Sequence, residues 1–208
     1  MRSGRGKGEL VMMRNLLAAF LFTLLAGCFS SSLPESHAWT VSPRTDLPSV
    51  VLPPEGQAAF AVTRLGAVTV SAPYDKPPFV VHRADGSVAF DAYNVFASTP
   101  ASLVRSAVKN RFAADGRFGH VVESASSAAA DAQVEVTVTN LSLDCRENNR
   151  RLARATVSVD VVKMGRGPRD VALSGSGSGE ADASSGDYTA AFSAAFDNAL
   201  AEALRALK

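Results

Sequence analysis

Alternating apolar and polar residues mark the clearest strands of this chain. Residues 134–139 alternate valine with Glu or Thr, and residues 153–161 alternate Ala or Val with Arg, Thr, Ser and Asp. A period of two is typical of a half-buried antiparallel strand. After the first segment, Leu141 and Leu143 resume in the opposite phase, which predicts a one-residue bulge near Asn140.

Three further segments have the composition of strands. Residues 60–70 are rich in Val and Thr, and Gly66 within them indicates a bulge or a close backbone approach. Residues 79–83 and 87–91 flank an Asp-Gly pair, which predicts a β-hairpin. Residues 171–179 end in alternating Ser and Gly, for which a strand with one bare face is favoured over a flexible loop.

Two segments repeat apolar residues every three or four positions, as amphipathic helices do. The first follows Ser98 or Thr99 as a helix cap and Pro100 in the first turn, and Gly116 ends it. The second follows Asp187, a good N-cap, and continues almost to the C-terminus. Strands combined with two such helices predict an α+β fold, a two-layer sandwich of a mostly antiparallel sheet with both helices on one face.

The N-terminus has the pattern of a secretory signal. Residues 1–14 are positively charged, residues 16–25 are apolar apart from one Thr, and small residues precede Cys28. Ten apolar residues cover only about half of a ~30 Å hydrocarbon layer, which argues against a transmembrane helix. Met12 and Met13 offer alternative translation starts to Met1.

Residues 25–28, Leu-Ala-Gly-Cys, resemble a bacterial lipobox at all four positions. The resemblance implies that residues 1–27 are a lipoprotein signal peptide and that Cys28 becomes acylated and anchors the chain in a membrane. Phe29 follows Cys28 instead of the Asp that retains enterobacterial lipoproteins at the inner membrane, which favours the outer membrane. The alternative is an ordinary signal peptide, which would leave Cys28 free to pair with Cys145 in an oxidising compartment.

Residues 28–57 are predicted to form a tether, because five prolines lie among serines and few large apolar residues. Residues 37–41, with the only Trp of the chain, interrupt it and are expected to dock on the domain as an edge strand, with a membrane contact by Trp39 as the alternative. Residues 58–208 then form a single α+β domain.

Composition excludes several classes of function. Lys and Arg number 21 against 20 Asp and Glu, so a net charge of +1 gives no basis for nucleic-acid binding. Two cysteines and the isolated His37, His82 and His120 lack the spacing of metal ligands, and no metal or other cofactor is expected. The Gly-Ser run is neither a nucleophile elbow nor a phosphate-binding loop, so enzyme motifs are absent and we expect a protein that is not an enzyme.

Two surface segments remain for recognition. Arg146, Arg150, Arg151 and Arg154 form a basic run for which a solvated hairpin turn is favoured over an anion site, since no aromatic residues are interleaved. Cys145 beside them is expected to be an unreactive thiol at a strand end. Residues 72–78 place Tyr74 among three prolines in a stiff loop, which suits recognition, although a covering loop is the favoured interpretation.

The order of these parts resembles the ABC-type transport auxiliary lipoprotein family, in particular its PqiC-like group. The most specific pieces are V-x-V-x-x-P-x-x-x-x-P over residues 68–78, the hairpin ending in Asp-Ala-Tyr at residues 91–93, and the Asp-Tyr helix entry at residues 187–188. The resemblance covers residues 39–208. Phe96 stands where family members often carry Trp, which weakens any transfer of a partner contact to that position.

The resemblance implies a non-enzymatic periplasmic subunit, anchored in the outer membrane of a Gram-negative bacterium. Its implied partners are an MCE-domain protein and an inner-membrane ABC permease and ATPase, which together move lipids or other hydrophobic molecules and support envelope integrity. A homo-oligomer is compatible with this assignment. Docking of the periplasmic partner at the membrane is the expected mechanism, with Tyr74, Pro77, Phe79 and Phe96 as candidate contacts.

An outer-membrane assembly or lipopolysaccharide-handling lipoprotein that binds its ligand directly is the alternative function. A cavity lined by Phe112, Phe192 and Phe196 would favour it, whereas a filled core would favour docking. A periplasmic enzyme would instead require titratable groups that converge in a cleft, and the sequence displays no such set.

Overall fold

The computed structural model describes residues 34–42, 59–147, 150–165 and 170–208. The chain divides into two units, Met1–Glu35 and Ser36–Lys208. The second unit contains all the strands and helices discussed below. The signal peptide predicted for residues 1–27, Cys28 and most of the predicted tether lie outside the described residues.

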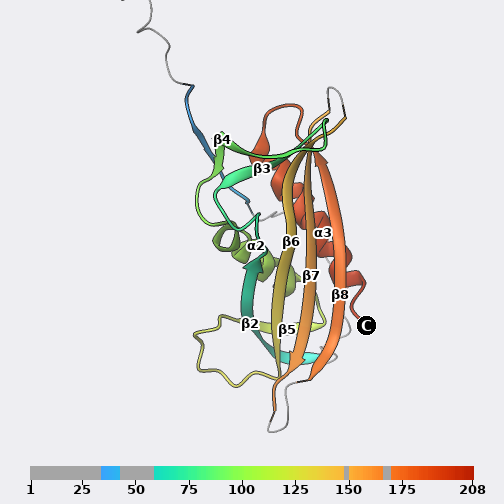
Figure 1. Ribbon diagram of the computed structural model, residues 1–208. Helices are drawn as coiled ribbons and strands as arrows, with labels where there is room; N and C mark the ends of the chain where they lie inside the picture. Colours follow the sequence, from blue (N-terminus) through green and yellow to red (C-terminus); the bar gives the residue numbers. More distant parts are fainter. Residues whose placement is uncertain (1–33, 43–58, 148–149, 166–169) are drawn as a thin grey trace, which may run out of the picture. The chain divides into compact units, whose positions relative to one another are not determined.

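Strand β6 (Ala132–Cys145) is the strand around which the sheet is built (Figure 1). One edge of β6 pairs along its whole length with β7 (Leu152–Lys163), which pairs in turn with β8 (Val171–Asp182). The other edge is shared, because its first half pairs with β2 (Phe60–Val70) and its second half with β3 (Pro78–Arg83). The sheet therefore divides into two branches at the middle of β6.

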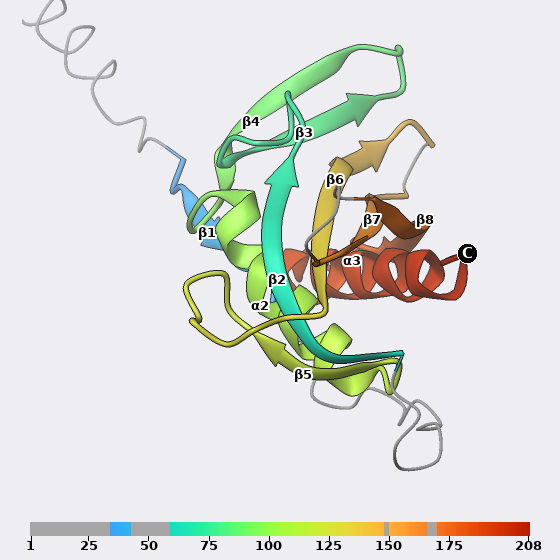
Figure 2. The same cartoon turned by 90° about the horizontal axis from the view of Figure 1, so that it is seen from below.

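The remaining elements extend these branches. Strand β4 (Val88–Phe96) pairs with β3 and carries β1 (His37–Trp39) on its outer edge, while β5 (Phe118–Val122) pairs with β2. Helices α2 (Pro100–Ala114) and α3 (Tyr188–Arg205) cover the same face of the sheet (Figure 2). The predicted α+β class with two helices on one face is confirmed.

The sheet is mixed in its strand directions. The pairs β3–β4, β6–β7 and β7–β8 are antiparallel, and the pairs β1–β4, β2–β5, β2–β6 and β3–β6 are parallel. Parallel neighbours require a long crossover connection. Helix α2 supplies one, because it carries the chain from β4 across the sheet to β5 and β6.

Both predicted irregularities of the strands are confirmed. The pairing of β6 with β7 shifts register between Val138 and Asn140, so the apolar residues on both sides of the bulge are buried. The pairing of β2 with β6 shifts between Leu65 and Val68. A Cβ atom at Gly66 would lie 2.8 Å from the Gln133 side chain, so the glycine allows the two strands to approach there.

The helix starts differ in how they are capped. Asp187 caps α3, because its Oδ1 accepts a hydrogen bond from the Ala190 backbone N–H (3.0 Å). Helix α2 begins at Pro100 as predicted, but the Thr99 side chain makes no capping hydrogen bond. Its first turn instead depends on the Thr99 carbonyl, which accepts from the Ser102 N–H at 2.9 Å. Proline at the first position removes one of the donors that would need a cap.

The Ser-Gly run is a strand with one bare face, as favoured from the sequence. Its glycines lie opposite Val159, Val157 and Ala155 of β7 and face α3. A Cβ atom on Gly177 would lie 2.7 Å from the Cβ of Glu202 and closer still to the backbone of Ala199. The helix therefore lies nearer to β8 than any larger side chain would allow.

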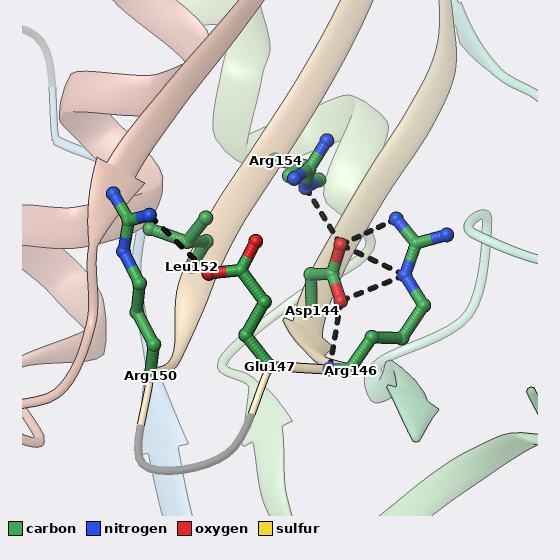
Figure 3. Close-up of a pocket in the computed structure, with 6 residues that line it drawn as sticks. All are labelled: Asp144, Arg146, Glu147, Arg150, Leu152 and Arg154. Carbon is green, nitrogen blue, oxygen red and sulfur yellow. Dashed lines mark hydrogen bonds and ion pairs between the residues drawn. The ribbon is translucent and has the colours of Figure 1, made fainter. Parts of the chain in front are cut away.

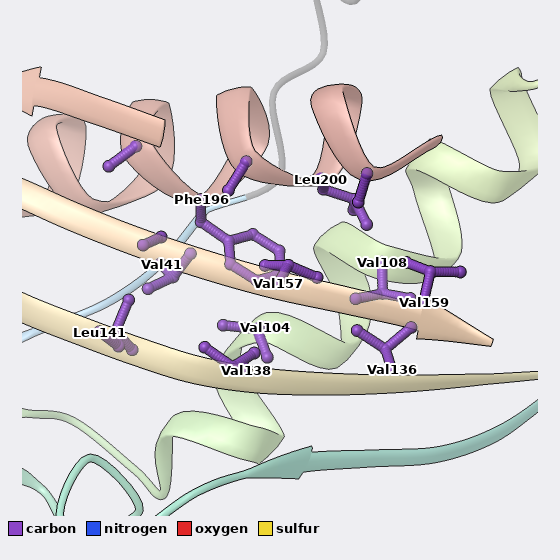
Figure 4. Packing of buried hydrophobic residues seen from close by; sticks show 14 of the residues in the cluster. Val41, Val104, Val108, Val136, Val138, Leu141, Val157, Val159, Phe196 and Leu200 are labelled. Carbon is purple, nitrogen blue, oxygen red and sulfur yellow. The ribbon is translucent and has the colours of Figure 1, made fainter. Parts of the chain in front are cut away.

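The core lies between the sheet and the two helices (Figure 4). Alternate valines of β6 and β7 point toward α2 and α3, and Phe196 of α3 lies over Val157. Val104 and Val108 of α2 face the same layer, as the predicted apolar stripe requires. Within the described residues, no helix has both the length and the apolar character needed to cross a bilayer.

The contact between α3 and β8 leads to a prediction about stability. Gly177→Ala adds a methyl group where the helix backbone already lies, so we expect a loss of about 1–3 kcal/mol in the free energy of unfolding, measured by urea denaturation. Ser176→Ala is the matched control, because Ser176 is exposed and belongs to the other face of β8. The control should change stability by less than ~0.5 kcal/mol. Equal stability of the two variants would contradict the close contact.

Candidate functional site

The segment around Trp39 is part of the domain, as the sequence predicted. Residues 37–39 pair in parallel with residues 94–96 of β4, and the Trp39 Nε1–H donates to Asn94 Oδ1 at 3.0 Å. The indole ring lies edge-on to Tyr188 of α3, with 5.1 Å between the ring centroids. Trp39 is therefore held by protein groups, which leaves the alternative of a membrane contact by its ring without support.

Helix α3 also holds the residues that follow β1. The Ser42 N–H donates to Ser193 Oγ at 2.9 Å, and the Thr40 N–H donates to Thr189 Oγ1 at 3.4 Å. Val41 lies in the core. The part of the predicted tether over residues 37–42 is therefore fixed to the domain, and only residues 29–36 remain between Cys28 and β1.

Two of the four predicted partner contacts lie inside the protein. Phe79 is 0% exposed and Phe96 is 3% exposed. Their rings lie 4.6 Å apart by centroid, and both pack against Phe192 of α3 at 4.8 and 5.1 Å. Neither ring is available to a partner in this structure. Their role is to join the branch of the sheet formed by β3 and β4 to helix α3.

The other two predicted contacts, Tyr74 and Pro77, lie in the loop between β2 and β3 and are half-buried. The Tyr74 N–H donates to the Ser71 carbonyl at 2.9 Å, which closes a turn. The Pro77 carbonyl accepts from the Phe96 N–H at 2.7 Å, so the loop is attached to the end of β4. The structure thus attaches Pro77 to the strand on which β1 docks.

An exposed apolar surface on β4 was missed in the sequence. Val88, Phe90 and Tyr93 are 53%, 57% and 46% exposed. Among the described residues, Val171 is the one other large hydrophobic residue of comparable exposure. The available signal was the run of apolar residues at both odd and even positions of β4, which gives the strand two apolar faces although the core covers only one.

The predicted basic run lies at the turn between β6 and β7, around a shallow pocket of about 290 Å³. Figure 3 shows Asp144 between two arginines, with Arg146 Nε 3.0 Å from Oδ1 and Arg154 Nε 2.8 Å from Oδ2. Arg154 Nη1 also lies 2.7 Å from Glu180. The side chains that line the pocket are Asp144, Arg146, Glu147, Arg150, Leu152 and Arg154.

Each arginine that lines this pocket has a carboxylate partner, since Arg150 Nη1 lies 3.4 Å from Glu147 Oε2. Hydrogen bonds from the Arg146 side chain hold the pKa of Asp144 at about 2, below its usual value, and the nearby charge of Arg154 adds to the effect. Compensated charges of this kind do not attract an anion strongly. The arrangement supports the interpretation of this run as a solvated ionic turn.

Cys145 follows Asp144 and is a half-buried free thiol. Burial raises the pKa of the Cys145 thiol, and the nearby Arg151 lowers it only in part. Because the thiolate is the reactive form of cysteine, a raised pKa makes the side chain unreactive at neutral pH.

The three phenylalanines proposed to line a ligand cavity belong to the core. Phe112, Phe192 and Phe196 are all buried. Phe112 packs against Phe118 at 4.8 Å, and Phe192 packs against Phe79 and Phe96. These contacts fill the space beside the rings and favour docking over a ligand cavity at this place.

The titratable groups of the described residues form no metal-binding cluster of three or more His, Cys, Asp or Glu side chains. His37 lies on β1, His82 on β3 and His120 on β5. None of the three belongs to such a cluster in the described part of the chain.

The pairing of Asp144 predicts an acid-sensitive contribution to stability. The folded-state pKa is lowered, so the stabilisation is complete above pH ~4 and is lost as the pH falls toward ~2. Asp144→Asn should lower the free energy of unfolding at pH 7 by about 1–2 kcal/mol, a modest loss because water partly screens the exposed Arg146. In urea titrations at several pH values, it should also flatten the acid limb, which is the fall in stability between pH ~4 and ~2. Glu147→Gln is the control, since its carboxylate is exposed. A similar acid limb in Asp144→Asn would contradict the assignment.

Two solved structures are similar to this one. A crystal structure of a protein from Xanthomonas campestris in the DUF330 family has a TM-score of 0.52 at 18% identity, covering 81% of this chain and 88% of that protein. The crystal structure of an uncharacterised protein has a TM-score of 0.44 at 11% identity, covering 73% and 81%. No curated protein matches the chain.

A sequence model for the ABC-type transport auxiliary lipoprotein component matches residues 45–207. This match runs from the predicted tether to the end of α3 and so includes β2–β8 and both helices. The chain therefore belongs to the ABC-type transport auxiliary lipoprotein family.

Proposed function

We propose that this protein is an outer-membrane lipoprotein that faces the periplasm and serves as a non-catalytic auxiliary subunit of an ABC transport system with an MCE-domain partner. Its role is to hold that partner at the membrane while lipids or other hydrophobic molecules are transferred. The docking of β1 onto β4 is the observation that carries this proposal, because it joins the start of the domain directly to the segment that follows Cys28.

The length of the link supports a role at the membrane surface. Eight residues, 29–36, separate β1 from the acylation site, and the nine steps from Cys28 to His37 reach at most about 30 Å at ~3.3 Å each. A tether of residues 28–57 would have reached about three times as far. An acylated Cys28 therefore keeps the domain near the lipid instead of allowing it to range across the periplasm.

The loop of Tyr74 and Pro77 is the proposed contact for the partner protein. Both side chains are half-buried, and the Pro77 carbonyl joins the loop to the end of β4. The buried Phe79 follows this loop and Phe96 lies at its attachment point, so their packing on Phe192 holds the loop in place. A surface that is ordered before binding loses less conformational entropy when a partner docks.

The anchor is tested by Cys28→Ser. The native chain, purified from a Gram-negative host, should float with outer-membrane vesicles and weigh more than its residues by the mass of its acyl groups. The Cys28→Ser chain should lose both properties, because two or three acyl chains are needed for firm anchoring. Cys145→Ser is the control and should float like the native chain. A native chain with the mass of its residues alone would overturn the proposed anchor.

The partner contact is tested by photo-crosslinking in cells that contain the complete transport system. With p-benzoylphenylalanine at position 74, we expect an adduct that mass spectrometry identifies as the MCE-domain protein. Position 171 is the control, because Val171 is more exposed than Tyr74 but belongs to β8, away from the loop. Equal adducts at both positions, or none at position 74, would contradict docking through this loop.

A further inference from the structure

Three exposed apolar side chains lie on strand β4, Val88, Phe90 and Tyr93, and we call them the β4 patch. Phe90 is 57% exposed and is the most exposed aromatic ring described. Exposed apolar groups that gather on one element usually mark an interaction surface, whereas scattered ones do not. The fourth exposed residue, Val171, lies on β8 and does not belong to this patch.

The β4 patch lies at one end of the sheet. This end of the sheet extends over five strands. Val88 of β4 pairs with His82 of β3, which pairs with Asp144 of β6. Asp144 pairs with Leu152 of β7, which pairs with Asp182 of β8. Val171 pairs with Val162 at the opposite end of β7. The twelve residues of β7 span about 40 Å at ~3.4 Å each, so the two ends of the sheet are far apart.

The chain enters the domain beside the β4 patch. Strand β1 is parallel to β4 with His37 opposite Asn94, so the residue that precedes His37 lies toward Tyr93. Beyond these pairs, residues 88–93 of β4 have an outer edge with no partner strand among the described residues. The described chain therefore enters β1 next to the strand that carries the exposed apolar side chains.

The length of the link shows that the β4 patch can meet the bilayer. The nine steps from Cys28 to His37 reach about 30 Å, and the stretch of β4 from Asn94 to Val88 covers about 20 Å. A membrane that holds an acylated Cys28 is therefore within reach of the whole β4 patch.

The side chains of the β4 patch suit the interface between lipid and water. Phe and Tyr are favoured at that depth, where an apolar ring meets the acyl chains and a hydroxyl stays hydrated. Arg83 ends β3 and Asp85 lies in the hairpin turn that precedes Val88, and both are exposed. Charges at this position would remain among the headgroups while Val88 and Phe90 enter the apolar layer.

We propose that the β4 patch is a membrane-contact surface, which seats the domain on the bilayer that holds the acylated Cys28. This inference rests on the proposed lipidation of Cys28. Two attachments, the acyl chains and the β4 patch, then fix the orientation of the domain relative to the membrane. Acyl chains alone would fix only its distance.

The test places a tryptophan reporter on the patch of the full-length lipidated chain. Phe90→Trp is compared with Val171→Trp, a matched control because both parent residues are 57% exposed. Trp39 remains in all chains, and the parent chain supplies the baseline emission. Each chain is reconstituted into vesicles of phosphatidylethanolamine and phosphatidylglycerol, with and without bromine on the acyl chains, and the floated fraction is measured.

Brominated lipids should lower the added emission of Phe90→Trp by at least about twofold, since tryptophan at the interface meets the acyl chains, and should leave that of Val171→Trp unchanged. Unquenched emission from a floated Phe90→Trp chain would overturn this inference but not the anchor. A chain that does not float would overturn both. If the Phe90→Trp emission changes only after MCE-domain protein is added, the patch binds that protein instead and the membrane contact is overturned.

Discussion

The close contact between α3 and the bare face of β8 determines how the rest of the domain is arranged. Gly175, Gly177 and Gly179 present no side chains to the helix, whose backbone occupies the space where Cβ atoms would lie. At that separation, Phe196 lies over the valines of β7 and Phe192 reaches the branch of the sheet that contains Phe79. A larger residue on β8 would move the helix outward and loosen both contacts.

The same helix holds the start of the domain. The ring of Tyr188 makes a T-shaped contact with Trp39. The side chains of Thr189 and Ser193 accept hydrogen bonds from the backbone that follows β1. Residues about 150 positions apart in the chain therefore stabilise each other. Helix α3 thus holds β1 and residues 40–42 at the edge of the sheet, and residues 29–36 lie between Cys28 and β1.

The sequence was most informative where a pattern is local. The alternation in β6 and β7, the bulge near Asn140, the Asp187 cap and the Ser-Gly strand follow from neighbouring residues and were all predicted. Strand pairing depends on residues far apart in the chain, so the parallel pairs were not predicted. Alternation also does not tell which face of a hairpin strand is buried, and for this reason Phe79 was expected at the surface while the exposure of Phe90 was missed.

One corner of the domain brings together the features of the proposed mechanism. The Phe96 N–H donates to the Pro77 carbonyl and the Ala97 N–H donates to the Trp39 carbonyl, both at 2.7 Å, so the end of β4 joins the loop of Tyr74 and Pro77 to β1. The β4 patch continues from the same strand. A force exerted by a docked partner would be transmitted through β4 to β1 and the segment that leads to Cys28, without crossing the rest of the sheet. The core then needs only to keep β4 in place, a task that a filled, rigid interior performs and a ligand cavity would weaken.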